Sequence, residues 1–237
     1  MSVLEIRAKG LLMASHLKKT LIASLISAGL IGVGAIAVWS SATPPSAAAA
    51  PPFVEELGPD ALARGPSAVV LGNPQGDVTV IEYFDYQCPV CRKVHPFVEQ
   101  LVAEDSNVRV IHKHWPVFGA ASIYASRVAL ATRWQNRYEE VHDALMGTDG
   151  RLDEDKVRQA AVSAGVDMAR LERDLDARAD QIDAALGEAT IQAHSLQLQG
   201  TPGFVIGNYL VPGGLDLATM KEIVSDVRAS KTADQQG

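Results

Sequence analysis

Two cysteines occur in the 237-residue chain, and both belong to the segment Cys88-Pro89-Val90-Cys91. Residues i and i+3 of a helix share one face, and their α-carbons approach the roughly 5.5 Å separation that a disulfide requires. A bridge across so short a loop restricts the unfolded chain very little, so it contributes little stability. The spacing therefore predicts a reversible dithiol–disulfide couple rather than a structural crosslink.

The cysteine pair lies at the expected beginning of a helix. Pro89 suits the first helical position, and apolar residues follow it at helical spacing. The partial positive charge and the free N–H groups at a helix N-terminus stabilise a thiolate and lower its pKa. We therefore expect Cys88 to be the nucleophile and Cys91, one turn deeper, to resolve the intermediate. Pro89 and Val90 would tune the redox potential without supplying a catalytic group.

A metal site is the alternative interpretation of the same residues. Cys88, Cys91 and His95 could supply three ligands to copper or zinc, although no fourth ligand is near them in the sequence. Covalent haem attachment is excluded, because Arg92 rather than histidine follows Cys91. Our main expectation includes neither a metal nor any other cofactor.

Glu82 interrupts one apolar face of a predicted strand, the face of Val78, Val80 and Phe84. Burying a carboxylate there is costly unless the group has a role. Near Cys91, its pKa would be raised, and it could transfer a proton to or from the resolving thiol. The alternative is a glutamate at a solvent-exposed end of the strand.

The elements around the cysteines form a predicted βαβ unit. Residues 78–86 carry apolar side chains on both faces, which is typical of a central strand. The helix from Pro89 follows, and residues 108–117 form the next strand, so the two strands should be parallel with a right-handed crossover. Before this unit, we expect a short helix over residues 53–64 and a strand over residues 69–71.

The second half of the chain is predicted to be helical first and then β-rich. No β-rich run interrupts residues 119–199, which we interpret as a helical insertion. Gly207-Asn208 is a two-residue hairpin signal between two short strands. The expected helices span residues 122–146, 153–164, 167–176, 182–199 and 217–227, the expected strands span residues 203–206 and 209–212, and residues 229–237 should be frayed.

Charge divides the chain into a basic start and an acidic body. The net charge is −7, but residues 1–20 carry +3, residues 21–50 carry no charge and the remainder carries −10. An acidic body argues against a nucleic-acid partner, which would require a basic face. The uncharged residues 21–39, followed by an Ala/Ser/Pro tract, predict an export signal or an uncleaved membrane anchor, with a buried core helix as the alternative.

Several separated features together resemble the DsbA-type branch of the thioredoxin superfamily, over residues 68–229. Residues 80–91 are similar to the active-site strand and helix start of that family, with Glu82 in the place of its buried acid. The helical block interrupts the fold where that family carries its inserted domain. Gly200-Thr201-Pro202-Gly203 resembles its cis-proline loop, which packs against the cysteine pair, whereas an ordinary trans turn is the alternative.

The resemblance implies an α/β, thioredoxin-like fold with an inserted helical domain. Residues 1–52 would be the signal or anchor with its linker, and the following helix would be short. The expected divisions of the remainder are a short helix over residues 53–66, a first thioredoxin-like half over 67–118, the helical domain over 119–199, a second half over 200–230 and a flexible tail over 231–237.

The function implied by the resemblance is thiol–disulfide exchange outside the cytoplasm, for example in the periplasm. Exported proteins with cysteines would be the substrates, held at Thr201 and Pro202 by strand-like pairing. A membrane protein of the DsbB type, or an equivalent reductant, would be the redox partner. The oxidant role is our expectation, with a disulfide reductase or isomerase as the alternative.

Two departures from the best-known oxidase leave that alternative open. Val90 stands where the oxidase has a histidine that stabilises its dithiol form, and Thr201 resembles the residue of the isomerase and reductase branches. Those isomerases carry an additional N-terminal dimerisation domain, for which residues 53–66 are too short.

Overall fold

The computed structural model describes residues 58–234 of the chain. The predicted signal or anchor in residues 1–52 lies outside the described residues, as do residues 53–57 and 235–237. Within residues 58–234, no helix combines the length and the apolar composition that crossing a membrane requires.

A five-stranded mixed sheet forms the centre of the molecule, with the strand order β1-β3-β2-β4-β5. The predicted βαβ unit is confirmed, because β2 pairs in parallel with β3. The hairpin at Gly207 is also confirmed, since β4 pairs antiparallel with β5. The strands are β1 (Val69–Gly72), β2 (Val78–Phe84), β3 (Val108–His114), β4 (Gly203–Ile206) and β5 (Tyr209–Pro212).

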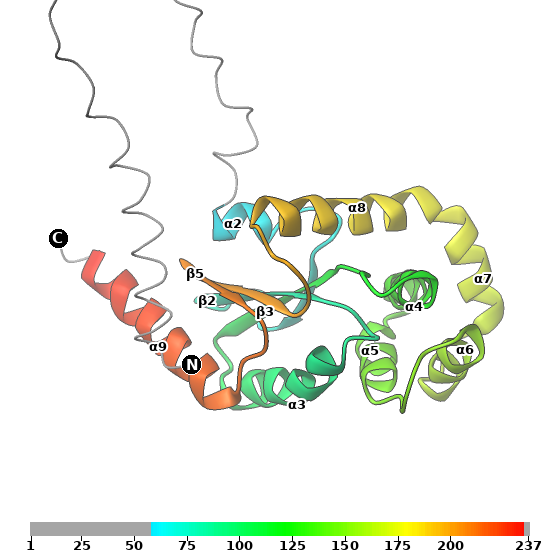
Figure 1. The fold of residues 1–237 in the computed structure, drawn as a ribbon, viewed down its shortest axis with the longest axis horizontal. Helices are drawn as coiled ribbons and strands as arrows, with labels where there is room; N and C mark the ends of the chain where they lie inside the picture. Colours follow the sequence, from blue (N-terminus) through cyan, green and yellow to red (C-terminus); the bar gives the residue numbers. More distant parts are fainter. Residues whose placement is uncertain (1–57, 235–237) are drawn as a thin grey trace, which may run out of the picture.

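Helices cover both faces of this sheet (Figure 1). On one face lie α3 (Pro89–Glu104) and α9 (Leu217–Asp234), and on the other lie α2 (Pro59–Leu62) and α8 (Ala179–Ser195). The thioredoxin-like α/β fold expected from the sequence is therefore the observed one.

Alternation along β2 explains why both faces are covered. Val78 and Val80 belong to the apolar core that includes residues of α3 and α9, whereas Ile81 and Tyr83 belong to the core that includes Leu62 of α2. A strand that is apolar on both faces must be buried on both, which is why β2 occupies the middle of the sheet.

Between β3 and β4 the chain is helical and lies beside one end of the sheet (Figure 1). Asp153 and Asp167 cap two of these helices, accepting hydrogen bonds from Lys156 N at 2.8 Å and Arg170 N at 2.9 Å. The largest core cluster joins these helices to the cysteine pair, because it contains Cys88 and Cys91. The elements before α8 are α4 (Ala120–Ala131), the 3₁₀ helix η1 (Thr132–Gln135), α5 (Tyr138–Met146), α6 (Glu154–Ser163) and α7 (Met168–Ala177).

The prediction of one continuous helix over residues 122–146 is wrong. The chain forms α4, η1 and α5 in that region, and Asn136 has a left-handed backbone with φ of 54°. Asparagine adopts this conformation more readily than most residues, so it can end a helix. The turn is closed by hydrogen bonds from Asn136 N to Arg133 O and from Arg137 N to Thr132 O, both at 3.1 Å.

Two strand ends differ from the expected boundaries. β2 ends at Phe84 rather than at residue 86, and β3 ends at His114 rather than at residue 117. The pairing of Phe84 with His114 is the last in the parallel ladder. Beyond it, the Asp85 carboxylate binds backbone N–H groups of both departing segments, which directs them away from the sheet.

The two terminal helices also differ from the expectation. In the described part of residues 53–64, only α2 is helical, because Gly58 before it has an extended backbone, with φ of −64° and ψ of 152°. At the other end, α9 continues to Asp234 instead of ending at residue 227 and fraying. Arg228 contacts Asp77 and Asp105, and Lys231 contacts the Asp77 carbonyl, which fixes these turns against the body.

Candidate functional site

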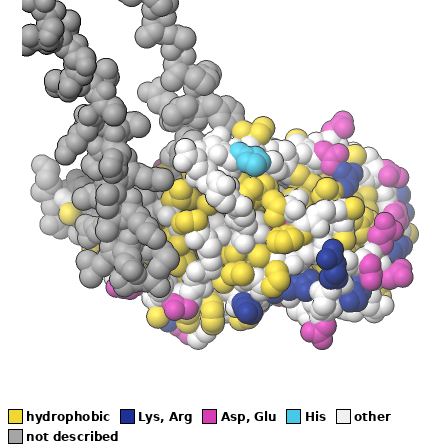
Figure 2. Space-filling view, viewed as in Figure 1, with side chains coloured by type: hydrophobic (Ala, Val, Ile, Leu, Met, Phe, Trp, Pro, Cys, Tyr) yellow, Lys and Arg dark blue, Asp and Glu magenta, His cyan; other side chains and the backbone are white. Residues whose placement is uncertain are grey.

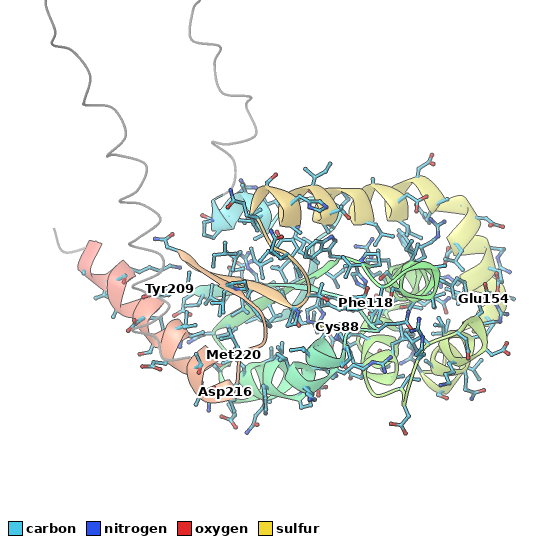
Figure 3. All side chains as sticks on the ribbon, viewed as in Figure 1. Cys88, Phe118, Glu154, Tyr209, Asp216 and Met220 are labelled. Carbon is cyan, nitrogen blue, oxygen red and sulfur yellow. The ribbon has the colours of Figure 1, made fainter. Side chains whose placement is uncertain are left out.

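Cys88 lies at the beginning of α3, as predicted (Figure 3). It is the N-cap residue with Pro89 directly after it, and its Sγ accepts a hydrogen bond from Cys91 N at 3.3 Å. The structure contains the dithiol form, and both cysteines are buried, with Cys88 2% exposed. The helix start thus directs its first free N–H groups at the Cys88 sulfur.

The two thiols have opposite acidities. The pKa of Cys88 is lowered from 9.0 to about 6, chiefly by the hydrogen bond from the Cys91 side chain, then by Thr201 and by the N–H groups of Cys91 and Val90, while burial opposes the shift. The pKa of Cys91 is raised far above its usual range, first by burial and then by its hydrogen bond with Cys88. Cys88 is therefore the thiolate at neutral pH, and Cys91 remains a protonated thiol.

The rate at which iodoacetamide alkylates the reduced protein is expected to be proportional to the fraction of Cys88 that is ionised. The rate should rise with pH around a midpoint near 6, because the pKa of Cys88 is lowered to about 6, whereas a free cysteine has a pKa of about 8.5. A Cys88→Ser variant is the control and should lose the rapid phase. A midpoint at or above pH 8 in the unmodified chain would contradict the assignment.

Glu82 is buried, so the alternative of an exposed strand end is wrong. Burial, and to a smaller extent the negative charge of Cys88, raises the pKa of Glu82 to about 8. His112 Nε2 lies 3.6 Å from Glu82 Oε2, while Oε1 has no hydrogen-bond partner within residues 58–234. A carboxyl that titrates near neutral pH beside the dithiol has the acidity that proton transfer requires.

The Thr201–Pro202 peptide bond is cis, so the alternative of a trans turn is wrong. Its loop contacts the helix start, because the Cys88 thiol donates a hydrogen bond to Thr201 O at 3.2 Å. Pro202 O accepts a hydrogen bond from Gly213 N at 2.8 Å, which ties the loop to the end of β5. Segments more than 100 residues apart in the sequence therefore meet at the Cys88 sulfur.

Asp85 is a site residue that the sequence analysis missed. Its carboxylate is fully buried and accepts four hydrogen bonds, from Gln87 N at 2.7 Å, Ser122 Oγ at 2.7 Å, Val117 N at 2.7 Å and Phe118 N at 2.9 Å. These bonds join the segment before Cys88 to the loop before α4. An acidic residue directly after a buried strand was the available signal.

Replacing Asp85 by asparagine is expected to lower the free energy of unfolding by about 2–4 kcal/mol, since hydrogen bonds to a charged group contribute more than neutral ones. The amide NH₂ would also oppose one of the N–H donors that the carboxylate now binds. Urea unfolding measures the loss. Asp153→Asn is the control, because asparagine also caps a helix, and its unfolding midpoint should be nearly unchanged.

A family model for the DSBA-like thioredoxin domain matches residues 79–225, a span that contains Cys88, Cys91 and the Thr201–Pro202 loop. The chain belongs to the DSBA-like thioredoxin domain family. Glu82 and Asp85 also lie within the matched span of this domain.

Among solved structures, a thioredoxin-like oxidoreductase from Silicibacter pomeroyi is 41% identical, with a TM-score of 0.69, and the match covers 73% of this chain and 98% of that one. The catalytic domain of Proteus mirabilis ScsC is 26% identical, with a TM-score of 0.65 and coverage of 72% and 94%. A periplasmic thioredoxin-like protein from Salmonella enterica is 25% identical, with a TM-score of 0.63 and coverage of 76% and 98%.

Among curated proteins, the Na(+)/H(+) antiporter NhaA 1 of Salinispora arenicola is 28% identical over 68% of this chain. The chain spans about a quarter of the length of that antiporter and of similar ones that it matches. The thiol:disulfide interchange protein DsbA of Bordetella parapertussis is also 28% identical, over 68% of this chain and 81% of its own length.

The surface around the DSBA-like site is apolar. Four hydrophobic residues are exposed there: Val90 in the first turn of α3, Val117 and Phe118 before α4, and Ile123 in the first turn of α4. The side chain of Gln87, next to Cys88, donates to Phe118 O at 3.3 Å, which brings this segment to the cysteines. Figure 2 shows hydrophobic side chains across the middle of the face where Figure 3 labels Cys88 and Phe118.

His95 does not join Cys88 and Cys91 in one group of potential ligands, so the metal alternative loses its third ligand, while metal binding by the two thiols stays an alternative. Within residues 58–234, His95 converges with His142 and Asp143, and the cysteines are not part of that group. The physical reason is the position of His95 on α3, where its ring contacts the His142 ring, with 5.0 Å between the centroids.

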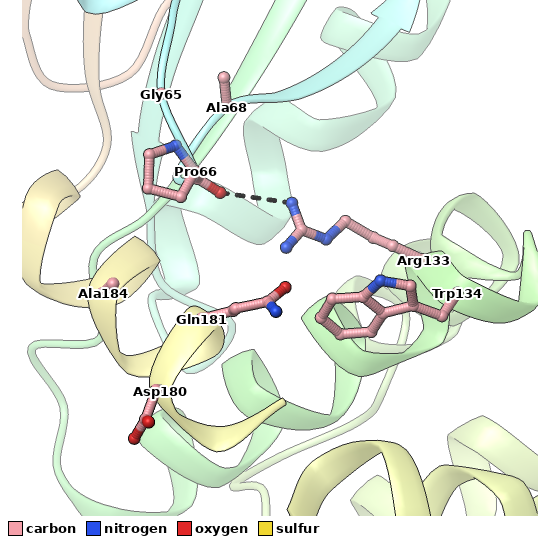
Figure 4. Close-up of a pocket in the computed structure, with 8 residues that line it drawn as sticks. All are labelled: Gly65, Pro66, Ala68, Arg133, Trp134, Asp180, Gln181 and Ala184. Carbon is pink, nitrogen blue, oxygen red and sulfur yellow. Dashed lines mark hydrogen bonds between the residues drawn. The ribbon is translucent and has the colours of Figure 1, made fainter. Parts of the chain in front are cut away.

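A separate hollow lies between the loop before β1, η1 and α8 (Figure 4). Its volume is about 600 Å³, and Cys88 is not among its lining residues. Arg133 donates a hydrogen bond to Pro66 O at 3.4 Å across it, and the Arg133 and Arg178 guanidinium groups lie 5.4 Å and 5.1 Å from the Trp134 ring. These contacts give Arg133 a structural role, and Cys88 and Cys91 are not among the residues that line the hollow.

Proposed function

We propose that this chain is an extracytoplasmic protein-disulfide oxidoreductase that transfers disulfides to exported proteins. The observation that carries the proposal is the pair of opposite acidities, with a Cys88 pKa of about 6 and a protonated Cys91, beside the Thr201–Pro202 loop. The DSBA-like family and the thioredoxin-like oxidoreductases of similar structure support disulfide chemistry at this position.

In the proposed reaction, a substrate thiolate attacks Cys88 Sγ of the oxidised protein and breaks the Cys88–Cys91 disulfide. Cys91 leaves as a thiolate and takes a proton, which Glu82 supplies because its pKa is about 8. A second substrate thiolate then attacks the substrate sulfur of the mixed disulfide. The substrate leaves with a new disulfide, having lost two electrons, and Cys88 is released as a stable thiolate.

The acidity of Cys88 favours the oxidant direction. At pH 7, lowering the pKa of Cys88 from 9.0 to about 6 stabilises the dithiol form by about 1.4 kcal/mol, equivalent to about 30 mV. A stabilised dithiol makes the disulfide a stronger oxidant. We therefore expect a reduction potential above the value of about −270 mV that is typical of thioredoxin.

The proposed substrates are unfolded segments of exported proteins. An extended segment would pair with the backbone of Thr201, which is independent of most substrate side chains. The exposed Val90, Phe118 and Ile123 would contact apolar residues that a folded substrate would bury. Export and the periplasm belong to this proposal and are supported by the N-terminal composition and by the periplasmic Salmonella relative. A DsbB-type membrane partner is the part of the proposal that rests on membership of the DSBA-like family.

Equilibration with glutathione, followed by refolding of a reduced cysteine-containing protein, tests the function. The oxidised chain should restore the activity of that protein stoichiometrically, and its potential should lie above about −270 mV. The Cys88→Ser variant should form no Cys88–Cys91 disulfide in the glutathione equilibration, and it should not restore the activity of the reduced protein. A reduction potential at or below that of thioredoxin would contradict the oxidant role and favour the reductase or isomerase alternative. A chain that exchanges no disulfide with the reduced protein would overturn the proposal.

A further inference from the structure

A second group of potential ligands lies away from the dithiol, where α3 faces α5. His95 and Glu99 are one turn apart on α3, and His142 and Asp143 are neighbours on α5. His95 Nε2 is 3.4 Å from Asp143 Oδ1 and 3.5 Å from Glu99 Oε2. One ligand atom from each of His95, His142 and Asp143 lies within 4.8 Å of the others.

These separations suit a tetrahedral metal site. Zinc binds histidine nitrogen and carboxylate oxygen at about 2.0–2.2 Å, which places the ligand atoms of a tetrahedron roughly 3.3–3.6 Å from one another. The two distances from His95 to the carboxylates already fall in that range. The His142 ligand atom lies within 4.8 Å of those of His95 and Asp143, and rotation of the His142 and Glu99 side chains would complete the arrangement.

His142 provides an independent indication of a ligand. It is buried, its Nδ1 interacts with the Tyr86 hydroxyl at 3.0 Å, and its Nε2 has no hydrogen-bond partner within residues 58–234. A buried nitrogen without a partner is costly. A metal-bound imidazole usually donates a hydrogen bond from its other ring nitrogen. Here His142 Nδ1–H would donate to the Tyr86 hydroxyl, which fixes the tautomer and leaves Nε2 as the ligand.

The charges near the group favour a cation. Within residues 58–234, the ion-pair partner of Glu99 and of Asp143 is His95, and neither carboxylate contacts a lysine or an arginine. A protonated His95 between the two carboxylates would be the alternative to a metal. That alternative leaves His142 Nε2 without a partner, whereas a bound cation satisfies both carboxylates and both imidazoles.

We infer that His95, His142, Asp143 and Glu99 bind one divalent transition-metal ion of the zinc type. Two imidazoles and two carboxylates form a ligand set that zinc accepts. The ion would join α3, whose N-cap is Cys88, to α5 of the helical segment between β3 and β4. The inference concerns metal binding alone and does not depend on the proposed redox function.

Zinc titration of the full chain carrying Cys88→Ser and Cys91→Ser tests the inference, because thiolates would otherwise compete for the ion. Isothermal titration should give one zinc per chain with a sub-micromolar Kd. His95→Gln and Asp143→Asn should each weaken binding at least about tenfold, the minimum effect expected even for groups that only support a ligand. Cobalt(II) bound in place of zinc should show a tetrahedral visible spectrum that either variant abolishes.

Matched controls are His194→Gln and Asp155→Asn, which remove an exposed histidine and an exposed aspartate outside the group. Both should retain the original affinity and the cobalt spectrum. Zinc affinity weaker than about 10 µM would overturn the inference, since structural zinc sites bind far more tightly. Unchanged affinity in both His95→Gln and Asp143→Asn would overturn it equally.

Discussion

A Cys91→Ser chain is expected to accumulate covalent complexes with cysteine-containing client proteins and to lose turnover. Its Cys88 thiolate can still attack a client disulfide, because the N–H groups at the start of α3 remain in place. The attack releases one client thiolate and forms a mixed disulfide through Cys88. Without a second thiol to displace the client, that mixed disulfide persists.

Non-reducing electrophoresis with mass spectrometry of the crosslinked peptide measures this outcome. A reductant should release the client, and Cys88→Ser should form no complex. The pKa of Cys88 will rise somewhat in Cys91→Ser, because the Cys91 side chain makes the largest contribution to lowering it. The trapping experiment should therefore be run at pH 8, and the absence of adducts there would contradict Cys88 as the nucleophile.

Replacing Glu82 by glutamine is expected to stabilise the fold and slow the chemistry. The pKa of Glu82 is about 8 in the folded protein, against an ordinary value of 4.5 for a glutamate. A raised folded pKa contributes stability that is present below pH 4.5 and lost as pH rises toward 8. At pH 7 the carboxyl therefore costs on the order of 3 kcal/mol, and Glu82→Gln should recover much of it.

Urea unfolding of the reduced protein measures this gain, which should be largest near pH 8 and small below pH 5. Glutamine keeps the shape but carries no transferable proton, so formation of the Cys91 thiol should slow about 100-fold or more, the effect known for general acid–base groups being about 10²–10⁴. Glu222→Gln, at an exposed position of α9, is the control for both measurements. A destabilised Glu82→Gln chain with normal exchange would contradict the assigned role.

The sequence alone predicted those features that depend on the spacing of neighbouring residues. The Cys88 position follows from Pro89 and the helical pattern after it, and the alternation around Glu82 predicts a buried strand. The parallel pairing of β2 with β3 follows from the intervening helix. Each of these inferences needs only residues that are close together in the chain.

What could not be predicted depends on residues that are distant in the sequence. Three of the four hydrogen bonds of Asp85 come from Val117, Phe118 and Ser122, more than 30 positions away. The low pKa of Cys88 was assigned to the helix start, but Thr201, 113 positions away, also lowers it, and the neighbouring Cys91 side chain makes the largest contribution.

Local composition was misleading between residues 122 and 146. Hydrophobic spacing there continues on both sides of Asn136, and only the left-handed backbone of that residue separates α4 and η1 from α5. A single asparagine is too common inside helices to indicate such an interruption from the sequence.

The two cysteines share one apolar cluster with Leu145 of α5 and Leu171 of α7. A graft of the tetrapeptide Cys88-Pro89-Val90-Cys91 onto a smaller thioredoxin would leave those neighbours behind and admit water beside the sulfurs. Burial is the first cause of the raised pKa of Cys91, so the transplanted pair would lose much of its contrast in acidity. The redox properties of the cysteine pair therefore depend on the whole folded domain, and transferring the four-residue motif alone would not reproduce them.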